Sequence, residues 1–228
     1  MTRKKQTRGQ CTYCKRTYAK SGMLRHLPAC SQRHEAIEEA DEQTGANEYL
    51  FHLRAQDAWS GDFWLDWEVR GSATLQQIDE YLRAIWLECC GHLSRFSIGG
   101  AWGSEKISMN RQVGQIFAPD VELTHIYDFG TSSETTIKCV SMREGKPTTS
   151  HPIALMARNS VPEDTCIECG QPAAWLCMDC LYETGQGGLL CDQHAESHSH
   201  DNYGEPAPLV NSPRTGMCGY TGPAEPPY

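Results

Sequence analysis

Cysteine and histidine residues crowd two short stretches of the chain, one near each end. The longer stretch contains Cys166, Cys169, Cys177, Cys180, Cys191, His194, His198 and His200. The shorter one contains Cys11, Cys14, His26 and Cys30. Zinc takes four Cys or His ligands in a tetrahedron, and a Cys-x2-Cys turn lets two thiolates reach one ion. The types and spacing of these residues therefore predict zinc sites at both ends.

We expect these sites to be structural. Twelve ligands in groups of four account for about three zinc ions per chain and suggest no open coordination position. A short segment without a core of its own can be folded by the metal, because binding energy then becomes folding energy.

A disulfide framework is the alternative use of so many cysteines. The charged N-terminus has no apolar stretch behind it, so it is not typical of a secretory signal. No run of the sequence approaches the ~18 apolar residues of a membrane span. We therefore expect a cytoplasmic protein in a reducing compartment, and histidine interleaved with cysteine also favours metal.

Charge is distributed unevenly along the chain. The net charge is −9, yet residues 1–34 contain no Asp or Glu. A basic arm on an acidic body is typical of a tail that faces nucleic acid. The residues expected to contact nucleic acid are Arg3, Lys4, Lys5, Arg8, Lys15, Arg16, Lys20 and Arg25. A solubilising terminus held by the acidic body is the alternative interpretation.

Residues 11–30 resemble a Cys-Cys-His-Cys variant of the classical two-Cys, two-His zinc finger. Tyr18 and Leu24 occupy its two apolar core positions, and Ser21 is expected to cap a short helix that carries His26. One such finger reads only about three base pairs, so strong sequence specificity is not expected. A structural or protein-binding knuckle is an equally good interpretation of the spacing.

Residues 47–158 have the pattern of one α+β domain. Alternation of apolar and polar residues predicts strands at 49–54, 63–69, 92–98, 122–128, 135–141 and 153–156. A helix from Thr74 to Cys89 would carry an apolar face, and a shorter helix is expected around Val113. The expected fold class is an α+β central domain with small zinc-stabilised modules at both ends.

Three stretches within this domain carry a family resemblance: Ala73–Arg83, His92–Phe96 and Tyr127–Gly130. Through them, residues 47–141 resemble the family named after open reading frame 3 of a root-inducing plasmid. The chain departs from that family at residues 131–133, where an acidic stretch with a Trp is usual. Members occur in bacteria, often as passenger or accessory proteins of insertion elements and plasmids. The resemblance implies a mobile-element setting and supplies no catalytic residue.

The C-terminal stretch resembles B-box-type modules, in which two zinc sites are cross-braced. The resemblance implies that Cys166, Cys169, Cys191 and His194 hold one ion and that Cys177, Cys180, His198 and His200 hold the other. Sequential pairing of the first four ligands is the alternative that spacing leaves open. Cys218 is expected to replace one of the last two histidines or to be a plain thiol.

A weaker hypothesis is a metal-dependent hydrolase centred on His125 and Asp128. Scattered histidines do not by themselves make a site, and half of the residues on an alternating strand face solvent. Cys89 beside His92 resembles a nucleophile and base, but its place on the apolar helix face favours a small core hydrophobe. No catalytic residue is therefore predicted.

The sequence thus predicts a non-enzymatic zinc-binding accessory or regulatory protein of a mobile element or plasmid, which contacts nucleic acid through its N-terminal finger. The alternative is a protein–protein adaptor with purely structural zinc sites, and the acidic central domain makes a protein partner expected in either case. The expected segments are 1–33, a basic arm and finger; 34–46, an acidic linker or helix; 47–158, the α+β domain; 164–220, the cross-braced zinc module; and 221–228, a loose tail.

Overall fold

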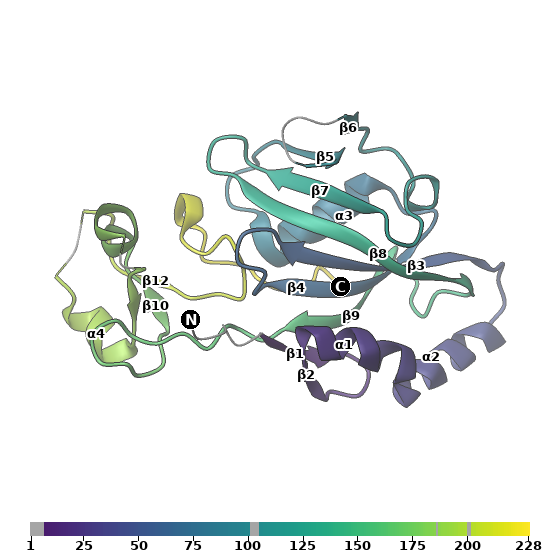
Figure 1. Cartoon of the computed structure of the whole chain (residues 1–228), viewed down its shortest axis with the longest axis horizontal. Helices are drawn as coiled ribbons and strands as arrows, with labels where there is room; N and C mark the ends of the chain where they lie inside the picture. Colours follow the sequence, from purple (N-terminus) through teal and green to yellow (C-terminus); the bar gives the residue numbers. More distant parts are fainter. Residues whose placement is uncertain (1–6, 101–104, 186, 200–201) are drawn as a thin grey trace.

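A computed structural model describes residues 7–100, 105–185, 187–199 and 202–228. Most of them belong to one antiparallel sheet with the strand order β2-β1-β9-β4-β3-β8-β7-β5-β6. A three-stranded sheet, β11-β10-β12, lies in a smaller part at the far end of the molecule (Figure 1). The prediction of a mixed fold of strands and helices is confirmed. None of the helices in the described ranges is long and apolar enough to cross a membrane.

The strands of the large sheet are β1 (Arg8–Cys11), β2 (Thr17–Ala19), β3 (Glu48–Asp57), β4 (Trp64–Arg70), β5 (Ser94–Ile98), β6 (Lys106–Ile107), β7 (Glu122–Tyr127), β8 (Ser133–Gly145) and β9 (Ile153–Asn159). Every strand expected between residues 49 and 156 has a counterpart among them. The strand expected at 135–141 runs farther in both directions, because β3 pairs with β8 along its whole length, from Glu48–Gly145 to Asp57–Thr135.

Helix α3 (Leu75–Leu82) covers the core face of this sheet. The Thr74 hydroxyl accepts a hydrogen bond from the Gln77 backbone, and the Gln77 side chain accepts one from the Thr74 backbone, which fixes the helix start. The helix then widens into the π turn η2 (Arg83–Leu87) and ends two residues earlier than expected. The short helix expected around Val113 is only the 3₁₀ turn η3 (Val113–Gln115).

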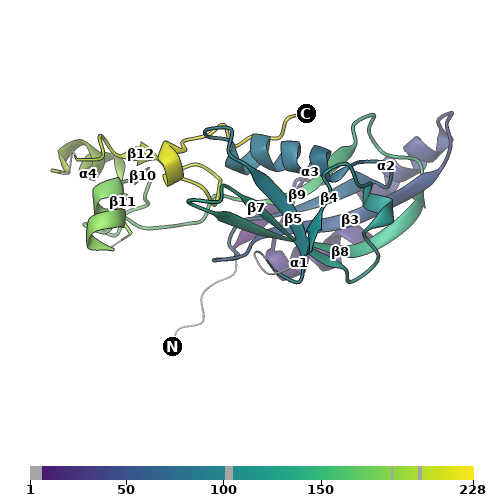
Figure 2. The ribbon, with the colours of Figure 1, turned by 90° about the horizontal axis from the view of Figure 1, so that it is seen from above.

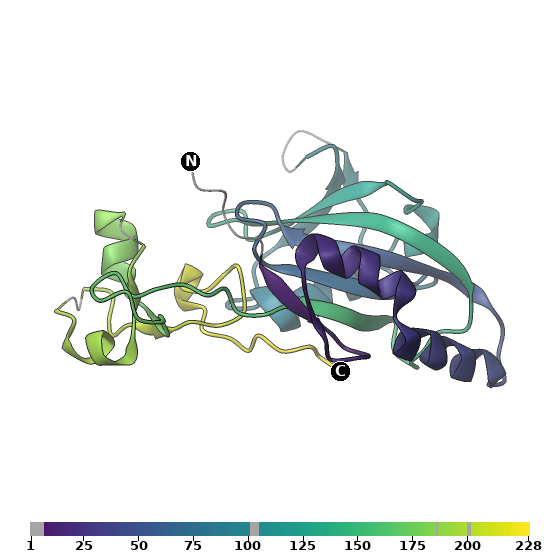
Figure 3. The same ribbon diagram turned by 60° about the horizontal axis from the view of Figure 1, so that its bottom comes forward.

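The N-terminal finger is built into one edge of the large sheet. Strand β1 pairs with both β2 and β9. Helix α1 (Lys20–His26), the 3₁₀ turn η1 (Leu27–Ala29) and helix α2 (Ser31–Glu42) then run in front of the strands (Figure 3). Met23 and Leu27 are buried against Trp64 of β4. The finger therefore shares its sheet and part of its core with the central domain, whereas its sequence predicts a separate module.

Ion pairs fill the rest of the face that the finger covers. Buried Asp66 of β4 accepts hydrogen bonds from Arg54. Two residues on, Glu68 accepts hydrogen bonds from Arg143 of β8 and Arg33 of α2. Strand β4 is thus apolar toward α3, whereas toward the finger it presents Trp64 together with the charged Asp66 and Glu68.

The C-terminal part consists of β10 (Trp175–Leu176), the π turn η4 (Cys180–Thr184), β11 (Leu189–Leu190), α4 (Asp192–Ser197) and β12 (Ala207–Pro208). Beyond β12 the chain returns to the large sheet through the turn η5 (Met217–Gly219), drawn in yellow in Figure 2. The Ser212 hydroxyl donates to the Trp86 carbonyl at 2.5 Å. Residues 221–228 were expected to be loose, but the Tyr228 ring stacks on His151 with centroids 4.1 Å apart.

Candidate metal centres

Four groups of Cys and His side chains in the described ranges have ligand atoms within 4.8 Å of one another. They are Cys11, Cys14, His26 and Cys30; Cys166, Cys169, Cys191 and His194; Cys177, Cys180 and His198; and Cys89, His92 and Cys218. All twelve cysteines are free thiols, so no disulfide framework is present. Each of the four groups could hold a metal ion.

The N-terminal group is assembled by the β1–β2 turn and helix α1. Strand β1 ends at Cys11, the turn carries Cys14, α1 ends at His26, and Cys30 directly precedes α2. Cys14 Sγ lies 3.3 Å from His26 Nε2, and Cys11 Sγ lies 4.0 Å from Cys30 Sγ. The Tyr18 ring stacks on His26 with centroids 4.0 Å apart, which fixes the orientation of the imidazole.

Metal binding at this group would displace a proton from a buried thiol. Burial raises the pKa of Cys11 to about 11, which favours the protonated form when no metal is bound. A metal ion that compensates the charge of the thiolate would release that proton. The group therefore has the donor atoms for a metal, and binding there is coupled to loss of a proton.

The core of the finger differs from the expectation. Leu24 is only half-buried, whereas Met23 and Leu27 are fully buried beneath the metal-ligand group. Ser21 lies inside α1, which begins at Lys20 without a side-chain cap. The classical pattern fails because this finger packs its helix on the sheet and so buries a different face.

The first C-terminal group joins a turn to the start of α4. The His194 Nδ1 atom lies 3.4 Å from Cys166 Sγ and 3.3 Å from Cys191 Sγ, and Cys169 Sγ lies 3.7 Å from Cys191 Sγ. Burial acts to raise the pKa of Cys166. The net pKa is nevertheless lowered to about 6 by hydrogen bonds from the backbones of Cys191, Glu168 and Cys169 and from the His194 side chain. The thiolate, which is the metal-binding form, is thus already favoured at this position.

The second C-terminal group contains Cys177, Cys180 and His198, with Cys180 Sγ 3.2 Å from His198 Nε2. Its fourth predicted ligand, His200, lies outside the described residues. The ligands are gathered in the interleaved order that the B-box resemblance implies, and not in the sequential order.

Glu168 connects the two C-terminal groups, although the spacing of Cys and His did not predict a role for it. One carboxylate oxygen lies 2.8 Å from His198 Nδ1, and the other lies 3.6 Å from His194 Nε2. These are the ring nitrogens that do not face the sulfur atoms, so one carboxylate can orient both imidazoles. Glu168 lies inside the Cys166-x2-Cys169 turn, and this position between two expected ligands is the sequence feature that could have predicted its role.

Cys218 lies with Cys89 and His92 and outside the two C-terminal groups. Of the two expected roles, replacement of a C-terminal histidine is therefore wrong, and the role of a plain thiol stays a prediction. Cys89 was expected on the apolar face of the helix. It lies beyond the end of η2, because the helix stops at Leu87, but it is half-buried and packs against the apolar core as expected.

The residues proposed for a hydrolase have separate partners. His125 is fully buried, and its Nε2 lies 2.7 Å from Asp79 Oδ1. Asp128 accepts a hydrogen bond from Arg214 at 2.8 Å. Neither His125 nor Asp128 belongs to a metal-ligand group of the described residues.

The basic residues expected to face nucleic acid divide into three sets. Those exposed on the finger are Arg8, Lys15, Arg16 and Arg25. Lys20 instead donates to the Gln56 side chain at 3.0 Å and to the Gly61 carbonyl at 2.8 Å, so it serves the fold. Arg3, Lys4 and Lys5 lie outside the described residues.

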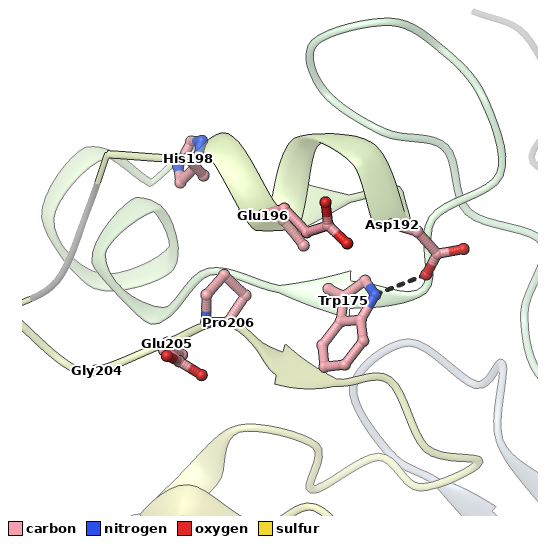
Figure 4. A pocket seen from close by; sticks show the side chains of 8 residues that line it. Trp175, Asp192, Glu196, His198, Gly204, Glu205 and Pro206 are labelled. Carbon is pink, nitrogen blue, oxygen red and sulfur yellow. Dashed lines mark hydrogen bonds between the residues drawn. The ribbon is translucent and has the colours of Figure 1, made fainter.

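A pocket of about 670 Å³ opens beside the C-terminal metal-ligand groups. The indole of Trp175 lies along it and donates to Asp192 at 2.8 Å (Figure 4). Glu196 and Glu205 supply two further carboxylates to its lining. An aromatic surface among carboxylates suits a cationic group better than an anionic one.

Comparisons with known proteins leave the family open. No family model and no curated protein matches the chain. Among solved structures it is similar to a protein of unknown function from Methanosarcina mazei Go1, with 18% sequence identity and a TM-score of 0.41. That similarity covers 54% of this chain and 75% of the other chain.

Proposed function

We propose that this chain is a zinc-binding accessory or regulatory protein of a mobile element or plasmid, and that its N-terminal finger contacts nucleic acid. The observation that carries the proposal is the convergence of Cys11, Cys14, His26 and Cys30 within 4.8 Å of one another. Three thiolates and one imidazole in that arrangement are a donor set for tetrahedral zinc, since harder cations prefer oxygen ligands.

The attachment of the finger to the sheet supports a role in binding. Arg16 and Arg25 are exposed, whereas their finger is fixed through strand β1 and the buried Trp64. Basic side chains on a rigid support suit phosphate contacts, which position a protein on nucleic acid without reading its sequence. The setting in a mobile element or plasmid is proposed on the sequence resemblance of residues 47–141 alone, since no family model matches the chain.

The test removes two positive charges from the finger. The variant Arg16→Ala/Arg25→Ala should weaken binding to a short DNA duplex and should lower the slope of log K against log salt by about one to two, because each lost phosphate contact contributes about 0.9. Fluorescence anisotropy over a salt series measures both quantities. Zinc content should be unchanged, because neither residue belongs to the metal-ligand group.

The matched control is Lys106→Ala/Arg111→Ala. It removes the same charge from exposed residues in and near β6, at the opposite edge of the sheet from β2. Equal losses in the two double variants would mean that net charge alone governs binding, and the proposed interface would be wrong.

The second candidate function is an adaptor that binds protein only. The pocket beside Trp175 favours it, because the carboxylates of Asp192, Glu196 and Glu205 would attract a basic peptide segment. In the DNA experiment, the adaptor hypothesis predicts no salt-dependent binding by the wild-type chain.

A further inference from the structure

Two segments that are distant in the sequence converge beside the large sheet. Cys89 and His92 lie between η2 and β5, and Cys218 lies in η5 of the returning C-terminal segment. Their ligand atoms lie within 4.8 Å of one another, although Cys218 is far along the chain from the other two. The spacing Cys89-x2-His92 is the same as that of Cys191-x2-His194, which both belong to one C-terminal group.

A charged network surrounds this cluster. The fully buried guanidinium of Arg214 lies 3.2 Å from Cys89 Sγ, 3.4 Å from Cys218 Sγ and 2.8 Å from Asp128 Oδ2. Zinc ligation would ionise both thiols, so that the sulfurs and Asp128 would carry three negative charges against one positive charge on Arg214. A divalent cation would bring the group to neutrality, with His92 as a neutral ligand.

His92 supplies an independent observation. Its Nε2 atom is buried and has no hydrogen-bond partner among the described residues. The nearest carboxylate oxygen, Asp128 Oδ2, is 3.6 Å away, which is beyond hydrogen-bond length. His92 belongs to the group, and a buried imidazole nitrogen without a hydrogen bond is a polar atom that a metal ion would satisfy.

The backbone is also held in an uncommon conformation here. Cys218 and Asp128 both have positive φ, at 52° and 65°. Such conformations persist in non-glycine residues where the surrounding structure enforces them, and they cluster at functional sites. The hydrogen bonds of Arg214 to Thr131 and Ser133 provide part of that enforcement.

We propose that Cys89, His92 and Cys218 form a zinc site with an open fourth coordination position. This group lies beside the well-packed central domain, with Cys218 exposed and the His92 side chain 31% exposed. Three protein ligands with a solvent-accessible fourth position are the arrangement in which zinc exchanges water for a small anion or thiolate. Asp128 Oδ2, 3.7 Å from Cys218 Sγ, stands beside that position.

The first test uses the wild-type chain and the neighbouring Cys90 as an internal control. With zinc bound, iodoacetamide should alkylate exposed Cys90 but leave Cys89 and Cys218 protected, as read by mass spectrometry of peptides. A chelator should expose both. If Cys89 and Cys218 react as fast as Cys90 with zinc present, there is no metal site. If they stay protected until a reductant is added, they form a disulfide, and the proposal is equally wrong.

Variants then test the ligand count and the open position. Cys218→Ser should lower the zinc content by about one ion per chain, and Cys90→Ser should leave it unchanged, since Cys90 is outside the group. In the cobalt-loaded protein, the absorption difference between wild type and Cys218→Ser isolates this site. Added cyanide should shift those bands by occupying the fourth position. Unshifted bands would show a closed site and overturn the open position, whatever the outcome of the DNA experiment.

Discussion

The best-defined buried charge outside the cysteine clusters is Asp79 on α3. Its carboxylate lies 2.7 Å from His125 Nε2 and accepts a hydrogen bond from Arg83 at 2.6 Å. Burial acts to raise its pKa, but the hydrogen bond and charge of His125, with Ser94 and Arg83, lower it to about 2. The carboxylate thus stabilises the fold in its ionised form.

This lowered pKa predicts the pH dependence of one variant. The stabilisation by Asp79 is present above its unfolded pKa of 3.8 and is lost as the pH falls toward about 2. Asp79→Asn should lower the free energy of unfolding at pH 7 by about 2 kcal/mol, and its difference from wild type should shrink below about pH 4. The difference is measured by urea unfolding of both proteins at each pH. Acid release of metal affects both proteins alike and therefore cancels in the difference.

Asp120→Asn is the control for this prediction. Asp120 pairs with Lys138 at 3.1 Å, but its side chain is 89% exposed, and an exposed pair contributes little. Asn also tolerates the positive φ of 70° at this position. A deficit in Asp79→Asn that stays constant from pH 7 to pH 3 would contradict the assignment of the stability to the carboxylate charge.

At the scale of elements, the decisive contact is the docking of β1 between β2 and β9. A Cβ on Gly9 would lie 2.5 Å from the Trp64 ring and still closer to the Arg158 carbonyl. The backbone can approach β9 only where no side chain intervenes. Gly9 therefore allows the finger to join the sheet.

Gly9→Ala should destabilise the docked finger by about 1–3 kcal/mol, because neither a carbonyl nor a packed indole can move away cheaply. Hydrogen exchange of the β1 and β9 amides should quicken, with little change in β3 and β8. Gly22→Ala is the matched substitution within α1, where the nearest atom would be 3.6 Å away and a better helix former is tolerated. If the β1 and β9 amides exchange at the same rates in Gly9→Ala and Gly22→Ala, strand docking does not depend on Gly9.

At the scale of the whole molecule, the two ends depend on metal to different degrees. The buried cluster of the C-terminal part consists of Cys166, Cys177, Cys180 and Leu190, so most of its core is made of ligands. The finger buries its ligands against Trp64 of the large sheet. The sheet and α3 have an apolar core of their own.

Removal of metal should therefore open the molecule unevenly. A strong chelator should abolish amide protection over residues 166–199 and reduce it in the finger. Strands β3, β4 and β8 should stay protected, because the core of the large sheet does not consist of metal ligands. Hydrogen exchange with mass spectrometry before and after chelation measures this order. Uniform loss of protection, or none, would contradict metal-dependent folding of the C-terminal part.

The sequence by itself determined the local features. Periodicity located the strands of the central domain and the start of α3, because each depends on neighbouring residues. The Cys and His spacings likewise located the ligands at each end, because a turn of fixed length brings Cys11 to Cys14 and Cys166 to Cys169.

Only the tertiary structure decided which distant segments of the chain contact one another. No local sequence pattern indicates that β1 pairs with β9, that Glu68 forms an ion pair with Arg33, or that Cys218 lies beside Cys89 and His92. These contacts join residues far apart in the chain, and they depend on which buried surfaces pack together, which no local pattern of residues specifies. Docking of the finger buries Cys11 and Cys30, and the returning C-terminal segment brings Cys218 to Cys89 and His92.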